Sequence, residues 1–108
     1  MATLAQGTKL ADGTVQDLVN ILLTKWVCGF LDLSNMVSGD TVIVTYKIQI
    51  KSGGNKIQHW QATYSGAQAN PMLPFPSMFI PYGIEVSIQQ TAQGAGGYKN
   101  FDYYFEKI

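Results

Sequence analysis

Apolar and polar residues alternate along the segment Thr41–Lys51 almost without interruption. Because successive side chains of a β-strand point to opposite faces, this period of two predicts a half-buried strand. The residues predicted to share its buried face are Val42, Val44, Tyr46, Ile48 and Ile50. A glycine-rich stretch, Ser52–Asn55, follows, and a second strand-like run covers Lys56–Tyr64. Together the three segments predict an antiparallel hairpin.

Three further segments have strand-like patterns and are bounded by turn-forming residues. They are Trp26–Leu33, Gly83–Thr91 and Asn100–Ile108. Several short alternating strands joined by glycine-rich turns are typical of two packed antiparallel sheets. We therefore expect an all-β chain, a compact antiparallel β-sandwich of jelly-roll-like or immunoglobulin-like topology. Residues 12–108 are expected to form this single domain, and residues 1–11, which lack any periodicity, a flexible N-terminal arm.

The segment 14–24 is compatible with two secondary structures. Its apolar residues recur at the spacing of one helix face, and Thr14 with Asp17 three residues later resembles a capping box. The same residues also allow a short strand over Thr14–Asn20. The periodicity slightly favours the helix, so we expect at most one short helix near residues 14–24.

All four prolines of the chain lie within residues 70–81, among several large apolar side chains. Proline cannot donate a hydrogen bond to a sheet, so this segment is expected to be a loop, a crossover or an edge strand. Its apolar side chains either close the end of the sandwich or form a contact surface for neighbouring subunits. We predict that the subunit interface contains five residues of this segment and three outside it: Met72, Leu73, Phe75, Met78 and Phe79, with Leu4, Leu10 and Tyr98.

Charge and composition narrow the function classes. The formal net charge is zero and the chain contains no arginine, so we expect no direct binding of nucleic acid. Only 13% of the residues are charged, which is typical of a protein that lives in an assembly. Cys28 is the single cysteine and is expected to be a small buried residue. We find no signal peptide and no apolar run long enough to span a membrane.

A search for catalytic or cofactor-binding residues finds no credible site. One histidine and one cysteine cannot form a usual zinc site, the acidic residues are dispersed, and no nucleotide-binding motif is present. We therefore predict no catalytic residue, no metal and no cofactor. The strand alternation places His59 on the sheet face opposite Trp60. Exposed aromatic residues such as Trp60 and Tyr64 leave sugar binding as an alternative, although core packing is the more natural use of both.

Several short motifs, in their order and spacing, resemble a group of small structural proteins of tailed bacteriophages and related viruses. The motifs are Asp12-Gly13-Thr14-Val15-Gln16, Asp32-Leu33-Ser34-Asn35-Met36 with Gly39-Asp40-Thr41, Ser52-Gly53-Gly54, Tyr64-Ser65-Gly66-Ala67-Gln68 with Pro71, and Gln90-Thr91-Ala92. Members of this group look like virion components of the head-decoration or minor capsid type. In them the part that matches Thr14–Asn20 looks strand-like, so the resemblance favours a strand there. The chain departs from the group in Ile21–Leu23 and in the longer loop Gln93–Tyr98.

The resemblance implies a non-enzymatic virion protein that stabilises a capsid lattice through protein–protein contacts. Its expected partners are the major capsid protein or other virion proteins and further copies of itself, for example in a trimer. Its expected location is the virion, assembled in the host cytoplasm. The arm, over Ala2–Leu10, is expected to add a strand to the sheet edge of a neighbour. The alternative is a tail or fibre adhesion module that binds surface glycans.

Overall fold

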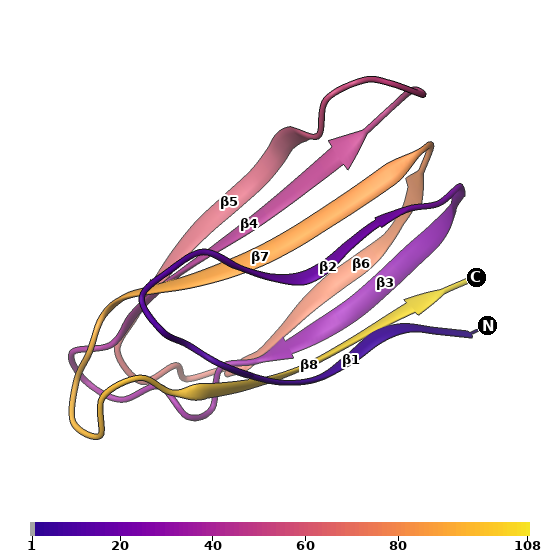
Figure 1. Ribbon diagram of the computed structural model, residues 1–108. Helices are drawn as coiled ribbons and strands as arrows, with labels where there is room; N and C mark the ends of the chain where they lie inside the picture. The colour runs from indigo at the N-terminus through magenta and orange to yellow at the C-terminus, as the bar shows by residue number, and fades with distance from the viewer. Residues whose placement is uncertain (1) are drawn as a thin grey trace.

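The computed structural model describes residues 2–108, and Met1 lies outside the described residues. These residues form eight strands and no helix (Figure 1). The strands are β1 (Ala2–Leu10), β2 (Gln16–Leu22), β3 (Lys25–Asp32), β4 (Thr41–Gln49), β5 (Ile57–Ser65), β6 (Met72–Ile80), β7 (Gly83–Ala92) and β8 (Asn100–Lys107). The predicted all-β class is confirmed, and so is the hairpin, in which β4 pairs antiparallel with β5.

The strands form two four-stranded antiparallel sheets that pack face to face. One sheet has the order β1-β8-β3-β6 and the other the order β2-β7-β4-β5. The chain therefore behaves as one long hairpin, with the pairs β1–β8, β2–β7, β3–β6 and β4–β5, that is rolled up into two layers. This arrangement is a jelly roll, one of the two expected topologies. Figure 1 shows both termini at the same end, on the neighbouring strands β1 and β8.

The structure decides between the two secondary structures considered for residues 14–24, and the strand is confirmed. The helix favoured by the periodicity of residues 14–24 is absent, and β2 lies there instead because its backbone pairs with β7 from Gln16 to Leu22. A register shift between Asp17 and Val19 turns Leu18 and Val19 both inward, which produces the helix-like spacing. The described part of the predicted flexible arm is β1, which pairs with β8 of its own chain from Ala2 to Leu10.

The core lies between the two sheets and is built from alternating residues of the strands. Its largest fully buried side chains include Phe101 and Phe105 of β8. Val42, Val44 and Tyr46 of β4 are buried as predicted. Ile50 is 73% exposed, contrary to the prediction, because β4 ends at Gln49.

The proline-rich segment is an edge strand, one of the three predicted forms. β6 pairs only with β3, so Pro74 and Pro76 lie where no further strand needs their missing N–H groups. A bulge interrupts this pairing: Val27 of β3 pairs with Met78, and Gly29 pairs with Phe75. β6 therefore has one residue more than β3 between these pairs.

A buried ion pair ties together two connections at one end of the sandwich. The side chain of Asp40, between β3 and β4, is fully buried and lies 3.2 Å from Nζ of Lys99, which precedes β8. The backbone amides of Val37 and Gly94 donate to its carboxylate over 2.9 Å and 2.7 Å. Gly94 approaches Ser38 so closely that a Cβ atom would overlap the Ser38 carbonyl oxygen. Only glycine allows this packing of the two loops.

Candidate functional site: an exposed aromatic face

The outer face of the sheet β1-β8-β3-β6 carries a row of large apolar side chains that are open to solvent. Trp26 and Phe30 of β3 are 50% and 49% exposed, and Met72 and Phe79 of β6 are 53% and 44% exposed. We call these four residues the aromatic face. Monomeric soluble proteins rarely expose contiguous apolar patches of this kind, so the face is the candidate functional site.

The pairing of β3 with β6 brings the members of the aromatic face together. Trp26 pairs with Phe79, and their rings meet edge to face with centroids 5.7 Å apart. Further along, Phe30 lies opposite Pro74, and Asp32 lies opposite Met72. The bulge in β6 lies between these two groups.

A shallow hollow of about 290 Å³ lies at one end of the aromatic face. Its apolar lining comes from Phe30, Met72 and two tyrosines of β8. Asp32 and Asp102 also line it, and no lysine does. The hollow therefore suits an apolar group of a partner that is accompanied by a positive charge.

The structure places the eight predicted interface residues in different environments. Met72 and Phe79 belong to the aromatic face. Leu10 at the end of β1 and Tyr98 in the loop before β8 are exposed elsewhere, at 58% and 37%. The other four face the core: Phe75 is buried in it, and Leu4, Leu73 and Met78 are partly buried and pack against the core.

Sequence reasoning missed Trp26 and Phe30, which form half of the aromatic face. The signal was present in the sequence, because apolar residues of β3 lie on both faces of the strand. Val27 and Leu31 are buried, while Trp26 and Phe30 point outward. A strand that is apolar on both faces, in a sandwich that covers only one of them, leaves an apolar surface exposed.

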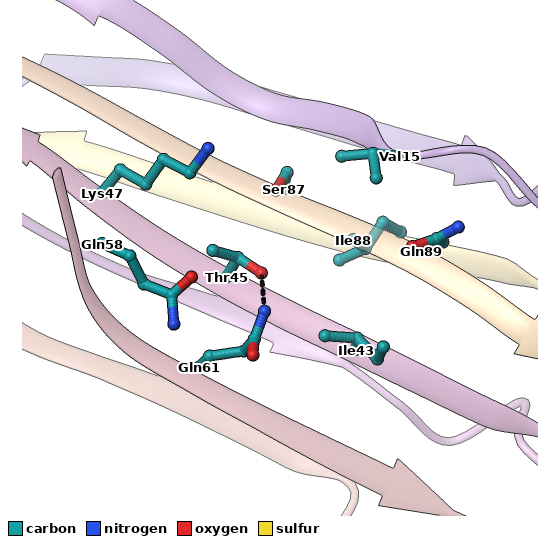
Figure 2. Close-up of a pocket in the computed structure, with 9 residues that line it drawn as sticks. All are labelled: Val15, Ile43, Thr45, Lys47, Gln58, Gln61, Ser87, Ile88 and Gln89. Carbon is teal, nitrogen blue, oxygen red and sulfur yellow. Dashed lines mark hydrogen bonds between the residues drawn. The ribbon is translucent and has the colours of Figure 1, made fainter. Parts of the chain in front are cut away.

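The outer face of the other sheet has the opposite character. A hollow of about 210 Å³ lies on this face. Figure 2 shows the residues that line it, mainly polar side chains of β4, β5 and β7 together with Val15. Gln61 donates a hydrogen bond to the Thr45 hydroxyl over 3.0 Å, and Lys47 forms an ion pair with the neighbouring Glu85 at 3.5 Å. No aromatic ring lines this hollow. The other sheet also exposes apolar side chains, among them Ile21, Leu22 and Ile57, but the exposed aromatic rings Trp26, Phe30 and Phe79 lie on β3 and β6.

The residues considered for chemistry are dispersed. Residues 2–108 contain no group of three side chains that could hold a metal ion, and none of their segments is a helix that could cross a membrane. Cys28 is only partly buried, on the outer side of β3, rather than in the core as expected. Asp40 accepts hydrogen bonds from the Gly94 amide and the Gln90 side chain, and Lys99 donates to the Gly97 carbonyl oxygen. These bonds tie loops together, which indicates a structural role.

The prediction that His59 lies opposite Trp60 is wrong. Tyr46 pairs with Trp60, whereas the next residue, Lys47, pairs with Gln58, so His59 is the extra residue of a β-bulge. As a result His59 and Trp60 line the same pocket. Trp60 is only partly exposed and packs edge to face against Phe75 at 6.0 Å. Trp60 therefore lacks the full solvent exposure that would favour glycan adhesion.

Comparison with known proteins identifies the fold. No protein-family model and no curated protein matches the chain. Among solved structures, a chain in the structure of the infectious bursal disease virus Gx strain matches with a TM-score of 0.58 at 17% sequence identity. The VP2 subviral particle of infectious bursal disease virus matches with a TM-score of 0.54 at 16% identity. Each match covers 95% of this chain but 29% of the other, so this chain spans less than a third of their length.

These matches define the class of the chain at the level of fold. It is a jelly-roll β-sandwich of the type found in proteins of virus particles. Jelly rolls occur both in viral capsids and in lectins, so the fold alone does not decide the function.

Proposed function

We propose that this chain is a non-enzymatic structural protein of a virus particle that binds other virion proteins through its aromatic face. The observation that carries the proposal is the exposed row of Trp26, Phe30, Met72 and Phe79 on one outer sheet face. The viral fold neighbours and the phage-like sequence motifs support the assignment to a virion.

The proposed contact is driven by burial of the aromatic face. Full burial of such a side chain is worth about 1.5–3 kcal/mol, so removing its remaining exposed half from water contributes about 1 kcal/mol per residue. Tryptophan and other aromatic anchors dominate the energy of protein interfaces. On a lattice the gain is repeated at every copy, which stabilises the particle by mass action.

The finer assignment is a decoration or minor capsid subunit of a tailed bacteriophage. It rests on the order and spacing of the turn motifs, such as Asp32–Met36 and Ser52–Gly54. Its partners would be the major capsid protein or other virion proteins, together with further copies of the chain, for example in a trimer. Met72 and Phe79 are the predicted interface residues that this proposal retains at the centre of the contact.

A test is the incorporation of variants into particles of the virus that encodes the chain. We expect the wild-type chain in purified particles at a fixed stoichiometry by quantitative mass spectrometry. The amount of the double variant Trp26→Ser/Phe79→Ser in the particles should be at least tenfold lower, because the loss of about 2 kcal/mol of contact energy weakens binding by more than a factor of ten.

The matched control is Val15→Ser/Ile57→Ser, which removes two exposed apolar side chains outside the aromatic face. This control should be incorporated like the wild type. Thermal unfolding of the free variants shows whether both remain folded. Absence of the wild-type chain from particles would reject the virion assignment, and equal incorporation of both folded variants would reject the aromatic face as the contact.

A further inference from the structure

A pocket of about 360 Å³ lies at the open side of the sandwich, where β5 and β6 are the last strands of their sheets. Side chains from both sheets line it: Tyr46, His59, Trp60, Pro74, Phe75, Pro76, Ser77 and Met78. Its volume falls in the usual range of small-molecule sites, roughly 300–1,000 Å³. It is separate from the outward-pointing aromatic face, and the proposed function does not use it.

Two β-bulges on opposite strands shape this pocket. On β5 the extra residue His59 turns toward the gap beside Trp60. On β6 the extra residue lies at Pro76–Ser77, directly across the gap. Bulges re-aim side chains and are frequent beside functional sites. Here both bulges direct side chains into one pocket.

The walls of the pocket are aromatic and carry no charge. Phe75 forms the floor, with the rings of Tyr46 and Trp60 each 6.0 Å from it. The His59 ring meets the Tyr46 ring edge to face at 4.4 Å. No lysine, aspartate or glutamate lines the pocket, so an ionic ligand would lose its hydration without compensation.

A few polar groups remain for a ligand. Tyr46 lines the pocket, although the residue as a whole is only 5% exposed. Burial raises the pKa of Tyr46 to about 12, so the hydroxyl is a protonated donor at neutral pH. Burial also lowers the pKa of His59, which keeps the imidazole neutral there. Donors and acceptors are thus available without charge.

We propose that this pocket binds a small uncharged apolar molecule, an aromatic or aliphatic alcohol in chemical class, whose hydroxyl bonds Tyr46 or His59. The rings of Trp60 and Phe75 bury its apolar part. A peptide strand fits this side less well, because Pro74 and Pro76 remove N–H groups from the edge of β6.

The experiment is an NMR titration of the full chain with 2-naphthol. His59 is the only histidine, so its imidazole C–H signals report the pocket without overlap. We expect a saturable shift of these signals with 2-naphthol and at least tenfold weaker binding of the charged analogue 2-naphthoate. Tyr46→Phe should weaken the binding of 2-naphthol about fivefold, the usual effect of one lost hydrogen bond. The binding of naphthalene, which has no hydroxyl, should not change.

The matched pair of variants is Ser77→Leu, which fills the pocket, and Thr63→Leu, which adds the same group to the exposed outer side of β5. Only Ser77→Leu should abolish the shift. If Ser77→Leu does not fold, Tyr46→Phe takes its place as the milder variant. The absence of saturation with 2-naphthol, or equal shifts in the two folded leucine variants, would overturn the proposal. So would a His59 shift that follows protein concentration alone, because the pocket would then hold a side chain of another copy.

Discussion

Replacing Asp40 with alanine is expected to lower the free energy of unfolding by about 3–5 kcal/mol, the usual cost of breaking a buried ion pair. The Asp40 side chain is fully buried and that of Lys99 is 13% exposed, so the substitution leaves an ammonium group with little water and no counter-charge. It also leaves the backbone amides of Val37 and Gly94 without their acceptor. Chemical denaturation at pH 7 measures the loss.

The same carboxylate should make stability depend on pH. Burial alone would raise the pKa of Asp40, but hydrogen bonds from Gly94 and Val37 and the Lys99 ammonium outweigh it and hold the pKa below its usual value. A lowered pKa in the fold stabilises the protein above the unfolded-state pKa of about 3.9. This stabilisation is lost as the pH falls through the lower, folded-state value.

We therefore expect a smaller decrease in stability between pH 7 and pH 3 in Asp40→Asn than in the wild type. The control is Asp17→Ala, an exposed carboxylate on β2, which should change stability by less than about 1 kcal/mol. An Asp40→Ala variant as stable as the wild type at pH 7 would show that the ion pair does not hold the two loops together.

Deleting residues 2–10 is expected to abolish cooperative folding. These residues form β1, whose backbone pairs with β8 along its whole length, and Leu4 packs against the core. Without β1, the strand β8 becomes an unprotected edge that carries two of the largest core residues, Phe101 and Phe105. A domain with only about 5–15 kcal/mol of total stability cannot lose one of eight strands without large-scale unfolding.

Thermal unfolding followed by circular dichroism checks this deletion. The truncated chain should show no sharp transition, and a synthetic peptide of residues 1–11 should restore one by pairing with β8. A truncated chain that melts at the wild-type temperature would mean that residues 2–10 act as a free arm, as the sequence alone predicts.

Much of the sandwich could be predicted because one face of most strands is buried. In β7, for example, the core residues Ile84, Val86 and Ile88 alternate with polar residues, and this period of two is visible in the sequence. In β2 the local signal misleads, because the register shift after Asp17 places two successive residues, Leu18 and Val19, inside. The pairing with β7 overrides the helical periodicity, which a single segment cannot reveal.

The candidate site was only partly predictable for a similar reason. The proline-rich segment indicated Met72 and Phe79, but the side to which each residue of β6 points depends on its bulge. Trp26 and Phe30 become a site only when β3 lies beside β6, and these two strands are far apart in the sequence. His59 likewise lies on the other face of β5 than the alternating pattern predicts, because a bulge in β5 interrupts the alternation.

The most direct test of the central claim is hydroxyl-radical footprinting of the chain, free and in purified virus particles, read by mass spectrometry. If the aromatic face contacts other virion proteins, the oxidation of Trp26, Phe30, Met72 and Phe79 falls strongly in the particle. Oxidation of the exposed Ile57 on the other sheet stays the same. Equal oxidation of the aromatic face in the free and particle-bound chain would contradict the account.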